Sequence, residues 1–273
     1  MSTFTPAFHT AQEQGISRIG LIVPSSNTTM ETELPELFAR QTAATGHRYT
    51  FHSARAALKN VTTEELLAMV ARAGDCATQV AEAGVDVIAY ACLVAVMAQG
   101  PGAHVGSEAT IKEAAEAAGH PAPAVSSAGA VVRTLEAMGA KKVAMIAPYM
   151  PPLVAMTRDY ITGSGIEVSQ AIGLSVSDNL QVGCLNPNNL VSLSQDLDLD
   201  GVDAVLLSAC VQMPSLPAVQ VVEDALGSVP VITAATATTY ETLMALGHEP
   251  RISGAGRLLS GQSIESLCTG AEA

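Results

Sequence analysis

One pattern occurs twice in the chain, and it constrains the fold more than any other feature. Gly84–Met97 reads GVDVIAYACLVAVM and Gly201–Met213 reads GVDAVLLSACVQM. In both copies Gly-Val-Asp precedes an apolar run, and the run ends on Ala-Cys followed by an apolar residue. Continuous aliphatic and β-branched runs are typical of strands buried on both faces of a parallel sheet. The repeat therefore predicts two equivalent strands, which end at Cys92 and Cys210.

Other segments of the two halves match in the same order. A strand predicted at Arg18–Val23 ends at Pro24, just as one predicted at Lys142–Ala147 ends at Pro148. Predicted strands and helices alternate along the chain, and this alternation indicates parallel sheets with helices on their faces. We therefore expect an α/β protein with two pseudo-symmetric, doubly wound parallel-sheet lobes. The active site is expected in the cleft between the lobes, because ligands of such sheets bind at the carboxyl ends of the strands.

The domain boundaries follow from the same repeat. Residues 15–126 plus 234–262 are predicted to form the first lobe, and residues 127–233 the second. Residues 1–14 are expected to be a flexible N-terminal extension, since they lack the basic and apolar regions of a signal peptide. Residues 263–273 are expected to be a flexible tail.

The composition excludes several classes of partner. A formal net charge of -13 argues against nucleic acid and against anionic membrane surfaces. No apolar run reaches the roughly 18 to 20 residues that a membrane span needs. The five cysteines are odd in number and scattered, so reduced thiols are expected in a chain without an export signal. We expect a cytoplasmic protein.

Neither a metal nor an organic cofactor is predicted. The six histidines show no pairing at helical or zinc-finger spacing, and no carboxylate cluster accompanies them. The chain has no phosphate-binding P-loop. The nearest approach to a dinucleotide fingerprint, at Gly100 and Gly102, lacks the third glycine at the required offset. Cofactor-free chemistry is therefore the better hypothesis.

The two strand-end cysteines are candidates for nucleophilic chemistry. Free cysteines are commonly buried and inert, and we assign that structural role to Cys76, Cys184 and Cys268. Cys92 and Cys210 differ because each ends a predicted strand and begins a turn. Unpaired backbone N–H groups in such turns are expected to lower a thiol pKa from about 8.5 toward neutrality.

A polar turn follows the first predicted strand. Ser25–Thr29 reads SSNTT and offers hydroxyls, an amide and backbone N–H groups to an anion. A plain helix cap by Ser, Asn or Thr would also explain the turn. The residues of this turn leave both interpretations open.

Four segments carry a family resemblance: VPSSNTTMETE at Val23–Glu33, YACLVA at Tyr90–Ala95, APYM at Ala147–Met150 and LSACVQM at Leu207–Met213. Together they resemble the maleate cis–trans isomerases of the aspartate/glutamate racemase superfamily, over about residues 16 to 261. Racemases of that superfamily typically have Asn-Thr after the first cysteine. Leu93 and Val94 occupy those positions here, which favours the isomerase.

The resemblance implies a role for each matching residue. Cys92 corresponds to the nucleophile, and Cys210 to a second cysteine that handles a proton. The substrate-binding positions implied by the family are Asn27, Tyr149 and Asn179 through their side chains, and Leu93, Val94 and Val211 through their backbone N–H groups. The implied activity is cofactor-independent isomerisation of maleate to fumarate through a covalent succinyl-cysteine, with maleate as the small-molecule partner. A homodimer is also expected.

Two other classes of function stay open from the residues alone. The first is another two-cysteine enzyme on the same scaffold, such as an aspartate/glutamate or hydantoin racemase or an arylmalonate decarboxylase. The second is a non-catalytic protein that binds carboxylates in the same cleft. Turnover of maleate would separate the enzymes from the binding protein, and binding without turnover would favour the latter.

Overall fold

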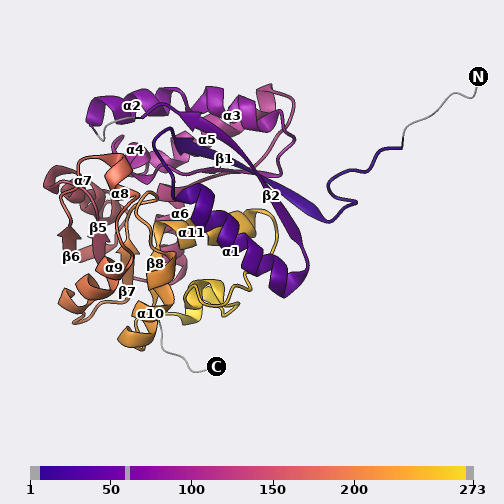
Figure 1. Ribbon diagram of the computed structural model, residues 1–273. Helices are drawn as coiled ribbons and strands as arrows, with labels where there is room; N and C mark the ends of the chain where they lie inside the picture. The colour runs from indigo at the N-terminus through magenta and orange to yellow at the C-terminus, as the bar shows by residue number, and fades with distance from the viewer. Residues whose placement is uncertain (1–6, 59–61, 269–273) are drawn as a thin grey trace, which may run out of the picture.

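The computed structural model describes residues 7–58 and 62–268, which form two four-stranded parallel sheets (Figure 1). The strands of the first sheet are β1 (Ile16–Pro24), β2 (Arg48–Ala56), β3 (Val87–Tyr90) and β4 (Ala124–Ser126), in the order β2-β1-β3-β4. Those of the second are β5 (Lys142–Ala147), β6 (Glu167–Gly173), β7 (Ala204–Ser208) and β8 (Val231–Thr233), in the order β6-β5-β7-β8. The second order repeats the first, so the predicted fold class is confirmed.

Helices connect and cover the strands. They are α1 (Met30–Thr45), α2 (Thr63–Ala71), α3 (Ala73–Ala81), α4 (Leu93–Met97), α5 (Ala103–Ala117), α6 (Ser127–Ala137), α7 (Pro151–Thr162), α8 (Asn179–Val182), α9 (Asn188–Leu193), α10 (Leu216–Leu226) and α11 (Ala234–Ala245). Short 3-10 turns occur at Ser194–Asp196, Arg257–Leu259 and Ile264–Ser266. Among the described residues, no helix is both long and apolar enough to cross a lipid bilayer.

The two strands of the repeated motif are central in their sheets. Every residue of β3 and of β7 is buried, as expected for apolar strands covered on both faces. β3 pairs with β1 and β4, and β7 pairs with β5 and β8, all in parallel. The residues that follow these two strands therefore emerge at the middle of each sheet's carboxyl edge.

Helix α11 connects the two sheets. α11 follows β8 of the second sheet, yet it packs against α1 and α6 and against β3 and β4 of the first. The lobe boundaries, with residues 234–262 in the first lobe, stay a prediction. All strands of the first sheet lie within residues 15–126, and those of the second within 127–233.

Two helices follow β2 with only Arg72 between them. α2 begins where the Thr62 side chain accepts a hydrogen bond from the Glu65 N–H at 3.3 Å. The break at Arg72 comes two residues before Gly74, whose helix propensity is low. The polar stretch after β6 contains α8, which begins where the Asp178 side chain accepts from the N–H groups of Leu180 and Gln181.

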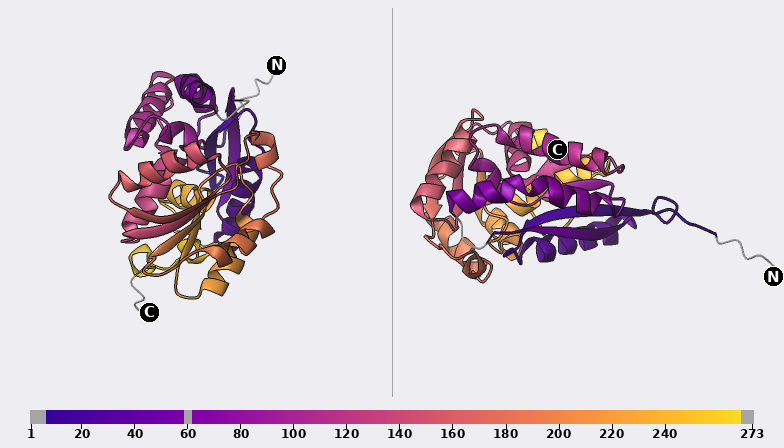
Figure 2. Two further views of the ribbon diagram at one scale, coloured as in Figure 1. Left: turned by 90° about the vertical axis from the view of Figure 1, so that its left-hand side faces the viewer. Right: turned by 90° about the horizontal axis from the view of Figure 1, so that it is seen from above.

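The ends of the chain behave differently from each other. Residues 7–15 lead away from the body beyond β1 (Figures 1 and 2). The C-terminal segment, which we expected to be a flexible tail, packs onto the body as far as it is described. Leu267 is buried there, and the Cys268 thiol donates to the Asp203 carbonyl at 3.3 Å.

Candidate active site

Cys92 and Cys210 occupy equivalent places in the two lobes. Each lies two residues beyond the end of its central strand. The intervening residues make matching contacts, since the Ala91 N–H donates to the Ile22 carbonyl at 2.8 Å and the Ala209 N–H to the Ile146 carbonyl at 2.9 Å. The sheet hydrogen bonds therefore continue up to each cysteine and fix where its side chain begins.

The two cysteines line one cavity between the lobes. Its walls contain all eight residues that the sequence pointed to, namely Asn27, Cys92, Leu93, Val94, Tyr149, Asn179, Cys210 and Val211. Pro24, Leu58 and Gln212 complete the lining and were not predicted. The cavity has a volume of about 20 Å³, which is room for about one water molecule. A four-carbon dicarboxylate therefore needs the walls to move apart before it can bind.

No charged side chain is among the described residues that line the cavity. The groups that line it are three side-chain amides, a phenol, two thiols and backbone N–H groups. These are neutral donors, so they can hold carboxylates without an ion pair. No three His, Cys, Asp or Glu side chains come together as a metal site within residues 7–58 and 62–268.

Both thiols are in an apolar environment that disfavours the thiolate. Burial raises the pKa of Cys92 to about 12, and the N–H of Ala95 lowers it only in part. Burial also raises the pKa of Cys210, against a hydroxyl hydrogen bond from Tyr149 and N–H groups of Gln212 and Met213. The expectation of thiol pKa values near neutrality is therefore wrong, because loss of solvation outweighs the hydrogen bonds.

This environment predicts an alkaline dependence of thiol reactivity. Since only the thiolate is alkylated, the rate at which iodoacetamide modifies Cys92 should rise about tenfold per pH unit from pH 7 to 9. Peptide mapping by mass spectrometry gives the rate for each cysteine, and the exposed Cys184 supplies a reference thiol. A Cys92 rate that levels off near pH 7 would instead indicate a thiol activated in the free protein.

Tyr149 bridges the site to Cys210. Its hydroxyl donates to the Cys210 sulfur, and burial raises its pKa well above the ordinary range. The hydroxyl therefore stays protonated at neutral pH and acts only as a hydrogen-bond donor or acceptor. Its place next to β5, directly after Pro148, is the counterpart of the polar turn that follows Pro24 in the first lobe.

The two predicted amides are already hydrogen-bonded inside the protein. Asn27 Oδ1 accepts from the N–H groups of Thr29 and Met30, both at 3.0 Å, so the residue supports the start of α1. Its Nδ2 donates across the lobes to the Val211 carbonyl at 3.2 Å. Asn27 therefore caps the start of α1, as the helix-cap interpretation of the turn predicts. It also lines the cavity.

Asn179 has a similar arrangement from the second lobe. Its Nδ2 donates to Ser26 Oγ of the first lobe at 2.7 Å. Each of these N–H₂ groups has two hydrogens, and the bond described here uses one of them, so either amide can donate to a ligand oxygen without losing its protein acceptor. The small volume of the cavity is what requires the walls to move apart before a ligand binds.

Glu33 is a second inter-lobe contact that the sequence analysis did not single out. This buried carboxylate on α1 accepts from the N–H groups of Ser215 and Leu216, at 2.5 and 2.7 Å, and so caps α10 of the other lobe. Burial raises the pKa of Glu33, and the carboxylate in turn raises that of Cys210. The sequence signal that could have indicated Glu33 is its place in the segment Val23–Glu33, which carries the family resemblance.

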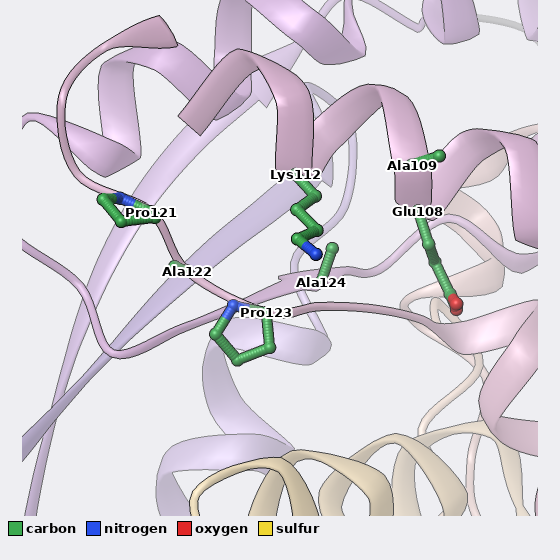
Figure 3. A pocket seen from close by; sticks show the side chains of 7 residues that line it. All are labelled: Glu108, Ala109, Lys112, Pro121, Ala122, Pro123 and Ala124. Atoms are coloured by element: carbon green, nitrogen blue, oxygen red, sulfur yellow. The ribbon is translucent and has the colours of Figure 1, made fainter. Parts of the chain in front are cut away.

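The remaining cysteines lie away from the cavity, as predicted. Cys76 is buried in α3, Cys184 is exposed and Cys268 is half-buried. A separate, open pocket of about 550 Å³ lies between α5 and the segment leading into β4. Figure 3 shows the Lys112 side chain extending from α5 toward Ala124, with Glu108 on the same helix and farther from Pro123. The described residues that line this pocket include no cysteine, serine or threonine, and Glu108 forms an ion pair with Arg133 at 3.0 Å.

Comparison with known proteins identifies the family. The arylmalonate decarboxylase family model matches residues 19–259. A maleate isomerase from Alcaligenes faecalis is 52% identical over 245 residues, which is 89% of this chain and 96% of that protein.

Two solved structures are also close in sequence and shape. A cysteine-to-alanine variant of the maleate isomerase Iso from Pseudomonas putida S16, determined with maleate, has a TM-score of 0.89 at 45% identity, covering 92% of this chain and 100% of that one. A cysteine-to-serine mutant of the Nocardia farcinica maleate cis–trans isomerase, with a covalently bound succinylcysteine intermediate, has a TM-score of 0.87 at 44% identity, covering 91% and 100%. The resemblance read from the four sequence segments is thus confirmed, and the chain belongs to the maleate isomerase family.

Proposed function

We propose that the chain converts maleate to fumarate without a cofactor, through a succinyl group held covalently on Cys92. One observation carries the proposal: two cysteines from equivalent strand ends share one closed, uncharged cavity. Relatives of 44 to 52% identity are maleate isomerases, and the Nocardia relative was captured with succinylcysteine.

The first step forms a carbon–sulfur bond. The Cys92 thiolate adds to one alkene carbon of maleate, and the electron pair of the double bond moves toward the remote carboxylate. The Cys210 thiol gives its proton to the other alkene carbon, so that Cys210 becomes the thiolate. The product is a succinyl thioether on Cys92, with a single bond between the two central carbons.

The second step reverses the first after rotation. Rotation about the new single bond carries the two carboxylates from the cis to the trans arrangement. The Cys210 thiolate then removes a proton from the same carbon, the carbon–sulfur bond breaks and fumarate leaves. The enzyme returns to its starting protonation state, and no oxidant or reductant is consumed.

We assign the carboxylates of the substrate to neutral donors. The proposed partners are the Asn27 and Asn179 amides, and the backbone N–H groups of Leu93, Val94 and Val211. Charge that develops on the remote carboxylate during addition is stabilised by such donors, at about 3 to 4 kcal/mol for each one in comparable oxyanion sites. Neutral donors suit a reversible step, because a strong cation would hold the charged adduct too firmly.

The buried thiols fit this chemistry in opposite ways. A raised pKa keeps the Cys210 thiol protonated, as a proton donor to carbon needs. The same environment makes the Cys92 thiolate scarce in the closed protein. We infer that Cys92 loses its proton while the lobes are apart and solvent reaches the cavity.

An ultraviolet assay of maleate loss tests the proposed function. The purified protein is expected to consume maleate and produce fumarate with no cofactor added, and dialysis against a chelator should leave the rate unchanged. A rate that is lost and then restored by one divalent ion would show that a metal takes part. Binding of maleate without turnover would favour a carboxylate-binding protein, while release of CO₂ from an arylmalonate would favour a decarboxylase.

Location and assembly are further parts of the proposal. The reaction needs two reduced thiols, which supports a cytoplasmic protein. The formal net charge of -13 supports a protein without nucleic-acid or membrane partners. We also propose a homodimer, which light scattering of the purified protein would test.

A further inference from the structure

Gln212 lines the reaction cavity, and its side chain adjoins two residues that line a second, outer pocket. Its side chain is buried and forms part of the cavity wall, two residues after Cys210. The outer pocket has a volume of about 420 Å³, and Thr28, Gly183 and Pro214 are part of its lining. Gln212 itself does not line the outer pocket, but its amide is bonded to Thr28 and lies next to Gly183, which do.

The Gln212 amide connects three segments of the chain. Its Oε1 accepts from the Thr28 N–H at 2.9 Å. Its Nε2 donates to the Ser26 carbonyl at 3.1 Å and to the Asn179 carbonyl at 2.8 Å. The first two partners belong to the polar turn after β1, and the third begins α8. One side chain thus ties the first lobe to the second directly above the cavity.

Gly183 provides the space that the amide occupies. A Cβ atom at this position would lie 2.6 Å from Gln212 Nε2 and 2.7 Å from Thr28 Oγ1. The φ angle of Gly183 is -65°, an ordinary helical value, so glycine is required here by packing and not by backbone conformation. A larger residue would push the amide out of its closed position.

The main chain of Gln212 is fixed independently of the side chain. Its carbonyl accepts from Thr29 Oγ1 at 2.6 Å, and its N–H donates to Cys210 Sγ at 3.3 Å. The amide can therefore leave its three partners by side-chain rotation alone, while the contact with Cys210 persists. This combination is suited to a movable part in an otherwise rigid wall.

We propose that the Gln212 side chain is the latch of the reaction cavity. It swings away from Thr28, Ser26 and Asn179 to admit a small dicarboxylate from the outer pocket, and it closes again behind the ligand. The identity of the ligand rests on the proposed function, whereas the latch itself does not. The Gln212 amide donates to the Asn179 carbonyl, so opening of the latch also releases the segment that carries this predicted carboxylate-binding residue.

Thiol accessibility without substrate tests the latch. In Gln212→Ala, and in Gln212→Met, which keeps the bulk but not the hydrogen bonds, iodoacetamide should modify Cys92 and Cys210 about tenfold faster or more. The rates are measured at one pH by peptide mapping. Gln181→Ala is the matched control, because this glutamine of α8 is exposed and does not line the cavity.

Two other cysteines calibrate the measurement. The exposed Cys184 should react equally in all variants, and the buried Cys76 in α3 should stay slow. Gly183→Ala provides a second route to the same result, since it displaces the amide without altering Gln212. It decides the question if the Gln212 variants do not fold.

Two outcomes would overturn the latch. The first is equal modification of Cys92 and Cys210 in wild type, in both Gln212 variants and in Gly183→Ala. The second is an acceleration that Cys76 shares, which would indicate general loosening of the fold. Neither outcome depends on maleate, so a protein that fails to turn over maleate would refute the proposed function and leave this test valid.

Discussion

Replacement of Cys92 by alanine is expected to lower maleate turnover by about 10⁴-fold or more, which is the scale for removal of a nucleophile. Without the sulfur no thioether can form, and the alkene carbons keep the double bond that prevents rotation. The fold and maleate binding should persist, because the change removes a single buried atom, whose loss frees the Ala95 N–H that faces it. Steady-state rates and calorimetric titration with maleate measure the two effects.

The matched control for this variant is Cys184→Ser. Cys184 is exposed and outside the cavity, so its replacement should leave the rate near that of wild type. Substantial turnover by Cys92→Ala would remove Cys92 from the mechanism, even with the control behaving as expected.

Replacement of Cys210 by alanine is expected to lower turnover by about 10²- to 10⁴-fold, the range found for loss of a general acid or base. Alanine cannot donate a proton to carbon. Among the described lining residues the other acidic groups are the Cys92 thiol, which is the nucleophile, and the Tyr149 phenol, whose raised pKa makes it a poor acid. Cys92 should still add to maleate in this variant. Mass spectrometry after acid quenching would then find the adduct while the production of fumarate is slow.

Retention of full activity in Cys210→Ala would contradict the two-thiol mechanism. Isotope incorporation in heavy water is less decisive, because a thiol enclosed in a cavity of about 20 Å³ can return the proton that it gave. Absence of deuterium from fumarate is therefore compatible with proton transfer, whereas the activity of the variant gives a direct answer.

The positions of the reacting groups could be predicted because strand ends in a parallel sheet are fixed by local sequence. An apolar run that ends on Ala-Cys indicates where the sheet's carboxyl edge lies, and the repeat predicted equivalent positions for Cys92 and Cys210. The family resemblance supplied Tyr149 and Asn179, which composition and spacing alone would have left as ordinary residues. Both line the cavity.

The thiol pKa values could not be predicted in the same way. N–H groups do face both sulfurs, as expected for turns after strands. Their effect is smaller than that of desolvation, which arises only when the second lobe covers the first. How completely two lobes close is a property of the whole molecule, and no local pattern around Cys92 records it.

Gln212 was missed for a related reason. The hydrogen bonds of its side-chain amide reach residues up to 186 positions away in the sequence. Glutamine is too common a polar residue to indicate such contacts. Glu33 likewise lies in Val23–Glu33, one of the segments that carry the family resemblance. Its function as a cap for α10 depends on a contact between the lobes. Local sequence therefore predicted which residues each lobe places at its strand ends. The contacts between the lobes that close the cavity could be found only in the structure.

The central claim is that maleate becomes covalently attached to Cys92 during turnover. It is tested most directly by mixing wild-type protein with maleate, quenching with acid within the turnover time and mapping the peptides by mass spectrometry. We predict a mass increase of one maleic acid on the peptide that contains Cys92 and none on the peptide that contains Cys210. An unmodified Cys92 peptide during active turnover, or an adduct confined to Cys210, would contradict the account.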